Sequence, residues 1–183
     1  LLTSIDPSSE VAKTAAAQKV NTLRCIAGQS WTWDGVRFDV LHPTSENYLD
    51  ESRKTNDRSC VIRVSNTHVS ALLTADIEAL SEREIIARSA ANSALKSDAL
   101  LIPHHGSRTS STPAFIDAVA PKIALINAGY RNRFGHPRED VLARYAERNI
   151  TVLRTDWHGA LTISSVDGFA RIQSARDARQ RYW

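Results

Sequence analysis

Three places in the sequence put metal-ligating side chains just after an apolar run. Asp76 follows one such run, the pair His104 and His105 follows the next, and His136 lies in a polar loop after a third. Imidazole and carboxylate groups are ligands that Zn²⁺ and Mn²⁺ accept in proteins. Two such ions held together hydrolyse phosphate or acyl groups. The pattern therefore favours a two-metal hydrolytic site.

Each of these residues also has a structural alternative. Asp76 directly precedes an expected helix and would serve as its N-cap, a position that Asp favours. The histidine pair fits a surface turn opened by Gly106, and His136 fits a turn residue before a proline. Their joint placement after strand ends favours the metal site, because ligands tend to bind at the carboxyl edge of an α/β sheet.

The elements that must position these residues can be read from apolar rhythm and turn signals. The first part predicts antiparallel strands, with a hairpin over residues 30–41 that turns at Asp34-Gly35. The later part alternates strands and helices, which predicts an α/β layered sandwich forming a single domain over residues 1–183. The expected strands are 22–26, 30–41, 59–64, 69–74, 98–102, 121–127, 150–153 and 159–164, and the expected helices are 10–19, 77–91, 110–119 and 138–148. Residues 44–58 are polar and aperiodic, so we expect a loop there.

Composition bounds the possible classes of protein. Hydrophobic residues make up 42% of the chain and charged residues 23%, which is typical of a globular protein. No stretch approaches 18 consecutive apolar residues, so we expect no membrane span in residues 1–183. The sequence contains no methionine, which predicts that it is part of a longer polypeptide.

Two further features remain open on the residues alone. The net charge is +3, and the segment 171–183 carries Arg171, Arg176, Arg179 and Arg181 against Asp177. Such a tail contacts phosphates in some proteins, but we favour a solvated end. The two cysteines, Cys25 and Cys60, lack metal-type spacing and are either buried thiols or a disulfide.

Five motifs follow one another along the chain: Leu72-Leu-Thr-Ala-Asp76, Ile102-Pro-His-His-Gly-Ser107, Ser110-Ser-Thr-Pro113, Gly129-Tyr-Arg-Asn-Arg-Phe-Gly-His-Pro137 and Arg154-Thr-Asp-Trp-His-Gly-Ala160. In this order they resemble one known family, the metallo-β-lactamase-like domain at the C-terminus of ComEC, the inner-membrane DNA-uptake channel of bacterial competence. Further matching segments lie at 25–31, 33–38 and 56–61, so the resemblance covers nearly the whole chain from Cys25.

The resemblance implies a metallo-β-lactamase-like αββα sandwich with a dinuclear Zn or Mn site at the edge of a sheet. By position, Asp76 is the bridging carboxylate. Of the two adjacent histidines we favour His105 as a direct ligand, with His104 supporting it or exchanged with it.

The same carry-over implies a set of residues around the substrate. Asn56 and Ser59 fall where other members place a further ligand, so they line the pocket. Ser107 and His136 lie near the scissile phosphate as hydrogen-bond donors. With Asn56, they are the expected catalytic residues.

The sequence departs from the family in two ways. The main ligand cluster, an HxHxDH-type motif, is missing from these 183 residues and is expected before Leu1, so the sandwich is incomplete on its N-terminal side. Ala75 stands where the family usually has glycine, and its methyl group is expected to crowd the turn beside the metal. We therefore expect part of a metal site and an inactive fragment.

The functional expectation that follows is a metal-dependent phosphodiesterase or nuclease that acts on DNA during uptake, with the strand that is not imported as its expected substrate. The implied partners are DNA, the rest of the ComEC channel and the competence machinery, with this domain on the periplasmic side of the inner membrane. That compartment permits a Cys25–Cys60 disulfide. The alternative is a non-catalytic DNA-binding or gating module, and a third option is another hydrolase, such as a phosphorylcholine esterase or a lactonase.

Overall fold

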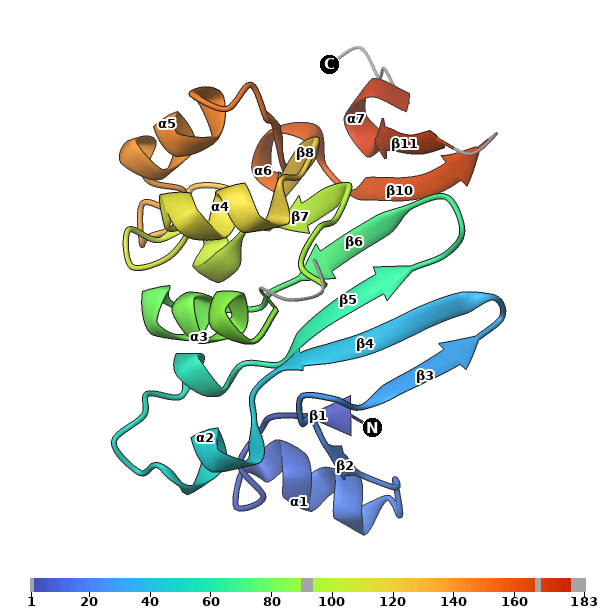
Figure 1. Cartoon of the computed structure of the whole chain (residues 1–183), viewed down its shortest axis with the longest axis vertical. Helices are drawn as coiled ribbons and strands as arrows, with labels where there is room; N and C mark the ends of the chain where they lie inside the picture. The colour runs from blue at the N-terminus through green and yellow to red at the C-terminus, as the bar shows by residue number, and fades with distance from the viewer. Residues whose placement is uncertain (1, 90–93, 167–168, 179–183) are drawn as a thin grey trace.

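The computed structural model describes residues 2–89, 94–166 and 169–178, and its centre is one mixed seven-stranded sheet (Figure 1). Neighbouring strands follow one another in chain order across the sheet, from β3 at one edge to β9 at the other. These strands are β3 (Ser30–Trp33), β4 (Val36–His42), β5 (Val61–Ser65), β6 (Ser70–Leu73), β7 (Ala99–Leu101), β8 (Ile123–Ile126) and β9 (Thr151–Arg154). The α/β class predicted from the sequence is confirmed.

Strands β3 to β6 form the antiparallel half of the sheet. Asp34 and Gly35 join β3 to β4 with φ angles of 50° and 75°, the left-handed conformation that a two-residue hairpin turn requires. The expected hairpin is therefore present. Strands β5 and β6 pair in the same way, with Ile62 opposite Leu73.

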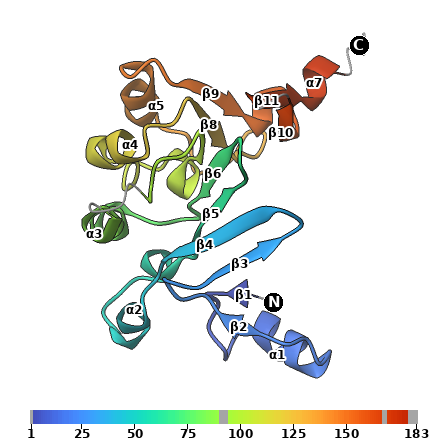
Figure 2. The same ribbon diagram turned by 45° about the vertical axis from the view of Figure 1, so that its right-hand side comes forward.

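Strands β6 to β9 form the parallel half, and helices provide their crossovers. The helices are α3 (Ala79–Ser89), α4 (Pro113–Val119) and α5 (Glu139–Ala146). All three lie on the same side of the sheet in both views (Figures 1 and 2). The crossovers place the carboxyl ends of these parallel strands at one common edge.

The main core lies between this helix layer and the sheet. Fully buried apolar side chains from the four strands β5 to β8 meet those of the three helices, and their removal from water is the main stabilising contribution. The strand members include Leu72, Leu100, Ala124 and Ile126, and the helix members include Ile85, Phe115, Ile116, Val141 and Tyr145.

The ends of the chain add two small sheets. β1 (Leu2–Thr3) pairs with β2 (Leu23–Arg24) across α1 (Glu10–Ala17), and a Cys25–Cys60 disulfide joins the residue after β2 to the residue before β5. Of the two alternatives that the sequence left open for these cysteines, buried thiols or a disulfide, the structure has the disulfide. Beyond β9 come α6 (Thr155–His158), the hairpin of β10 (Leu161–Val166) and β11 (Phe169–Ser174), and α7 (Ala175–Ala178).

Some expectations about elements were wrong. Residues 44–58 contain α2 (Ser45–Leu49) and the 3-10 turn η1 (Asn56–Arg58), because Thr44 and Asn47 form a capping box and distant side chains hold the rest. β11 was not anticipated, because residues 171–174 were attributed to a solvated tail. Residues 90–91 of the expected helix, and Arg179 and Arg181 of the basic tail, lie outside the described residues.

Within the part of the chain that is described, no helix has the length and apolar character needed to cross a membrane.

Candidate metal centre

The candidate residues gather at the carboxyl edge of the parallel strands. Asp76 lies in the turn between β6 and α3, and His104 and His105 lie in the 3-10 turn η2 (Pro103–Gly106) after β7. His136 belongs to the loop between β8 and α5. The apolar runs that end at these positions form buried strands, so the sequence pattern placed the polar residues correctly at the sheet edge.

The backbone at this edge adopts conformations that are costly for residues other than glycine. Ala75, His104 and His105 have φ angles of 47°, 48° and 55°. The two segments are joined by a hydrogen bond of 3.0 Å in which the His104 N–H donates to the Ala75 carbonyl. Such left-handed residues cost roughly 1 kcal/mol or more each and tend to cluster at functional sites. The turn therefore accommodates Ala75 where the family usually has glycine. The cost is a strained backbone at the residue directly before Asp76.

Gly106 closes the histidine turn against the neighbouring loop. Its φ is +79°, and a Cβ atom there would lie 2.7 Å from the Cβ of Pro137. Its carbonyl accepts a 3.0 Å hydrogen bond from the Arg138 N–H. Only glycine permits this approach, so the histidine turn and the loop that carries His136 are packed directly on each other.

His105 and Asp76 form the pair best suited to hold a metal ion. The His105 Nδ1 lies 2.8 Å from the Asn127 carbonyl oxygen, which fixes the proton on Nδ1 because a carbonyl can only accept. Its other ring nitrogen, Nε2, lies 3.3 Å from Asp76 Oδ1. A ligating histidine commonly donates its second ring nitrogen to a carbonyl in this way.

His104 is surrounded by polar side chains on both ring nitrogens. Its Nε2 lies 3.4 Å from Asn56 Nδ2, while its Nδ1 lies 3.3 Å from Thr109 Oγ1 and 3.6 Å from Glu78 Oε1. The Asn56 amide also donates to Glu78 Oε1 at 3.4 Å. These contacts make His104 part of a hydrogen-bonded group beside the Asp76–His105 pair.

His136 approaches the same group from the neighbouring loop. Its ring centroid lies 6.0 Å from that of His104, in an edge-on arrangement. Burial, followed by the positive charge of Arg138, lowers the pKa of His136 below the ordinary histidine value. Its Nδ1 is buried and has no hydrogen-bond partner, which is an unusual state for a buried polar atom.

The remaining predicted residues lie close to this group but deeper. Ser107 is buried, and its Oγ lies 3.1 Å from Thr109 Oγ1, so it contacts the hydroxyl that reaches His104. Ser59 closes the η1 turn through a 3.0 Å hydrogen bond from its N–H to the Asn56 carbonyl.

Three contributors were missed by sequence reasoning: Glu78, Thr109 and the carbonyl of Asn127. Glu78 and Thr109 lie two residues beyond Asp76 and Ser107, which is the one signal that would have found them. The alternative reading of Asp76 as a helix N-cap is wrong, because α3 begins at Ala79.

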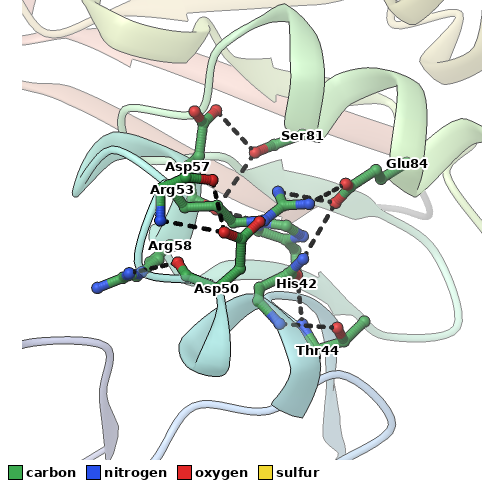
Figure 3. A network of polar contacts seen from close by, with 10 residues as sticks. His42, Thr44, Asp50, Arg53, Asp57, Arg58, Ser81 and Glu84 are labelled. Carbon is green, nitrogen blue, oxygen red and sulfur yellow. Dashed lines mark hydrogen bonds and ion pairs between the residues drawn. The ribbon is translucent and has the colours of Figure 1, made fainter.

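A buried polar network surrounds Asp57, the residue that follows Asn56 in the chain (Figure 3). The fully buried His42 lies with Nε2 2.8 Å from the Asp57 carbonyl oxygen, and Ser81 Oγ donates to Asp57 Oδ1 at 3.1 Å. Arg53 pairs with Glu84 beside them. The turn η1 is thus fixed between β4 and α3, and Asn56 at its start faces His104.

The residues present fit one side of a metal site. An imidazole nitrogen and a carboxylate oxygen face each other, and the partnerless Nδ1 of His136 lies in the same region. Among the described residues, no three His, Cys, Asp or Glu side chains gather closely enough to hold an ion.

Comparison with known proteins shows the class to which the chain is related. It is 37% identical over 160 residues to the competence protein ComA of Neisseria gonorrhoeae, a match covering 87% of this chain and 22% of ComA. It is 35% identical over 152 residues to recombination protein 2 of Haemophilus influenzae, covering 83% of this chain and 18% of that protein. ComE operon protein 3 of Bacillus subtilis is 36% identical over 126 residues, covering 69% of this chain and 15% of its own length.

The chain is therefore homologous to bacterial competence proteins. Within that class it fits the C-terminal domain of ComEC. It spans about a fifth of the length of these relatives. No protein-family model matches the sequence.

Two solved structures resemble the fold at low sequence identity. One is described as a metal-dependent hydrolase from Parabacteroides distasonis (TM-score 0.48, 13% identity, 81% of this chain and 62% of that chain). The other is described as a Zn-dependent hydrolase of the metallo-β-lactamase superfamily from Thermotoga maritima (TM-score 0.34, 14% identity, 62% and 52%).

Proposed function

We propose that this chain is the metal-dependent phosphodiesterase domain of a DNA-uptake channel, acting on DNA that arrives at the periplasmic face of the inner membrane. The observation that carries the proposal is the orientation of His105. Its Nδ1 is bonded to the Asn127 carbonyl and its Nε2 faces Asp76. This is the arrangement of a ligand pair with a fixed tautomer.

In the proposed site, Asp76 and His105 hold a Zn²⁺ or Mn²⁺ ion, with further ligands supplied by a histidine- and aspartate-rich segment of the same polypeptide. When bound, such an ion supplies positive charge that acidifies an attacking water and stabilises charge on the phosphate oxygens. His104, held by Asn56, Thr109 and Glu78, positions this edge of the site.

The proposed substrate contacts come from neighbouring side chains. Asn56 and His136 flank the histidine pair and donate hydrogen bonds to the scissile phosphate. Ser107 contributes indirectly. Its buried hydroxyl contacts the Thr109 hydroxyl, which in turn contacts His104. The proposed substrate strand is the one that is not imported.

The test uses the polypeptide that includes the segment preceding Leu1. Calorimetry measures Mn²⁺ binding, and a labelled oligodeoxynucleotide reports cleavage. Asp76→Ala and His105→Ala are each expected to reduce metal affinity and cleavage at least about 100-fold, because removing even an outer partner of a metal ligand costs about 10- to 100-fold.

The matched control is His68→Ala, which removes an exposed histidine from the β5–β6 turn at the opposite end of β6. It is expected to leave both measurements unchanged. Cleavage that survives Asp76→Ala with metal present would overturn the proposed site. Salt-dependent DNA binding with no cleavage under any metal would support the non-catalytic DNA-binding or gating module instead.

A further inference from the structure

Beside the candidate metal centre, the loop between β8 and α5 exposes two large aromatic side chains. Tyr130 is 73% exposed and Phe134 is 61% exposed. Neither ring contributes to the main core. Large aromatic side chains that are exposed next to a candidate site are candidates for contact with a ligand, because their exposure to water is unfavourable until a partner covers them.

The aromatic rings alternate with arginines. Arg131 lies over the Tyr130 ring at 5.2 Å from its centroid, and Arg133 lies over the Phe134 ring at 5.0 Å. Within the part of the chain that the structure describes, neither guanidinium makes an ion pair or a hydrogen bond. Residues 128–138 contain no Asp or Glu. The loop therefore presents uncompensated positive charge together with flat apolar surfaces.

The backbone of the loop is held independently of these four side chains. The Asn132 amide donates to the His136 carbonyl at 2.6 Å, and its oxygen accepts from the His136 N–H at 3.1 Å. The contact between Gly106 and Pro137 fixes the far end of the loop. The aromatic and arginine side chains are thus displayed on a backbone whose described hydrogen bonds do not involve them.

The loop also reaches the candidate site directly. The Phe134 ring stacks on His136 with centroids 6.2 Å apart and planes inclined by 17°, and His136 lies edge-on to His104. The next loop extends the same edge. Thr155 Oγ1 donates to the Ala128 carbonyl at 2.9 Å, and Trp157 in α6 is 62% exposed with Arg154 over its ring.

We propose that Tyr130 and Phe134, with Arg131 and Arg133, form a stacking surface for unpaired bases that leads a single DNA strand into the site. Bases stack on aromatic faces whatever their sequence, and guanidinium groups neutralise the phosphates between them. This inference rests on the proposed function for one point, namely that the bound strand leads to the metal site. The surface itself requires no metal, so binding can be measured apart from hydrolysis.

Duplex DNA is a poor occupant of this surface. Its bases are already stacked on each other, so exposed rings would gain no contact from it, while the arginines would still meet its phosphates. The surface is therefore expected to prefer single strands. The preference for single strands should depend on the aromatic rings. The salt dependence of binding should depend on the arginines.

The test is fluorescence anisotropy with the whole chain in EDTA, using a labelled 20-nucleotide poly-dT strand and a 20-base-pair duplex. Tyr130→Ala and Phe134→Ala are each expected to weaken single-strand binding about tenfold or more, the usual range for one base–aromatic contact. Arg131→Gln and Arg133→Gln are expected to reduce the slope of affinity against salt concentration.

Trp33→Ala is the matched control. Trp33 is 75% exposed in β3, at the opposite edge of the sheet from β9, and its loss should not change affinity. Circular dichroism melting curves establish that each variant is folded. Tyr130→Ala is the cleanest variant, because its ring has no contact with the histidines in the described interactions.

The proposal is overturned if the Tyr130 and Phe134 variants bind the single strand as tightly as the Trp33 variant does. Equal affinity for the duplex would also overturn it, as would ring-dependent binding to anionic lipid vesicles in place of the oligonucleotide. Loss of cleavage in Asp76→Ala with normal strand binding would support both proposals. Normal binding of the single strand without cleavage under any metal would support the stacking surface and contradict the proposed phosphodiesterase activity.

Discussion

At the scale of single residues, two histidines illustrate opposite uses of the same side chain. His105 keeps one ring nitrogen on a backbone carbonyl and presents the other to Asp76 at the surface. His42 is fully buried, with Nε2 on the Asp57 carbonyl and Nδ1 3.4 Å from an Arg88 guanidinium nitrogen. Only the first arrangement leaves a free nitrogen for an external ligand.

His42 should make stability depend on pH. Burial is the main cause that lowers the pKa of His42 below its ordinary value. In the unfolded chain the imidazole takes up a proton as the pH falls below about 6.5, whereas the folded protein resists doing so. The contribution of His42 is therefore complete above that pH and is lost as the pH falls, by at most about 1.4 kcal/mol per pH unit.

Urea denaturation at pH 7.5, 6.5 and 5.5 measures this effect. His42→Gln retains an amide that can donate to Asp57 and should remove part of the decline, while His68→Gln at an exposed position should not. An identical pH dependence in the His42→Gln protein and the unaltered chain would show that His42 is not responsible.

At the scale of elements, the candidate site depends on how loops are held between secondary structures. The segment before α4 is held by Glu82 of α3, whose carboxylate accepts hydrogen bonds from the Ser111 N–H at 2.5 Å and the Thr112 N–H at 2.8 Å. Arg144 of α5 donates to the Ser110 and Ser111 carbonyls, each at 2.9 Å. Helices α3 and α5 thereby fix the loop that carries Ser107 and Thr109.

Glu82→Ala is expected to lower the free energy of unfolding by about 3 kcal/mol, because it leaves the buried Ser111 N–H and the partly buried Thr112 N–H without an acceptor. Glu82→Gln should cost less, since its amide oxygen still accepts one hydrogen bond. Burial raises the pKa of Glu82, which also makes the neutral glutamine a mild replacement. Guanidinium denaturation measures both variants, and equal losses from Ala and Gln would argue against this role.

At the scale of the whole molecule, the disulfide ties the N-terminal unit to the main sheet. Cys25 and Cys60 are 35 residues apart in sequence, and their Cα atoms are 6.0 Å apart. The Tyr48 hydroxyl donates to the Cys25 carbonyl at 2.8 Å, so the α2 segment also contacts this junction.

Replacing both cysteines by serine is expected to lower the free energy of unfolding by about 2–4 kcal/mol, because the unfolded chain gains the freedom that closure of this loop removes. Thermal melting under non-reducing conditions measures the loss. Dithiothreitol should lower the Tm of the unaltered chain and have no effect on the serine variant. Two free thiols in the denatured, non-reduced protein would contradict the disulfide.

The sequence predicted the strands and the positions of the histidines because apolar runs and turn residues are local signals. Asp76, His104, His105 and His136 each follow a buried strand, and the sheet brings these ends together. Such signals do not report contacts between distant segments. Residues 44–58 were read as a loop because their order comes from contacts such as Arg53 with Glu84, 31 residues away.

The same limit applies to the site. Lys54 and Glu78 pair at 3.1 Å across 24 residues, and Glu78 also lies 3.6 Å from His104, which is 26 residues further along the chain. The left-handed conformations of Ala75, His104 and His105 had no local signal either, since residues other than glycine seldom adopt them.

The contact of Gly106 with Pro137 has a consequence for exchanging parts between related proteins. Because the two residues touch with no room for a side chain, the aromatic loop can be exchanged only if this contact is kept. A chimera that imports residues 128–138 from a relative must bring a loop that still seats proline against this glycine. The exposed Tyr130, Arg131 and Arg133 side chains can then be varied without disturbing this contact, so the proposed strand-binding surface can be altered on an unchanged scaffold. Phe134 differs from them, because its ring stacks on His136.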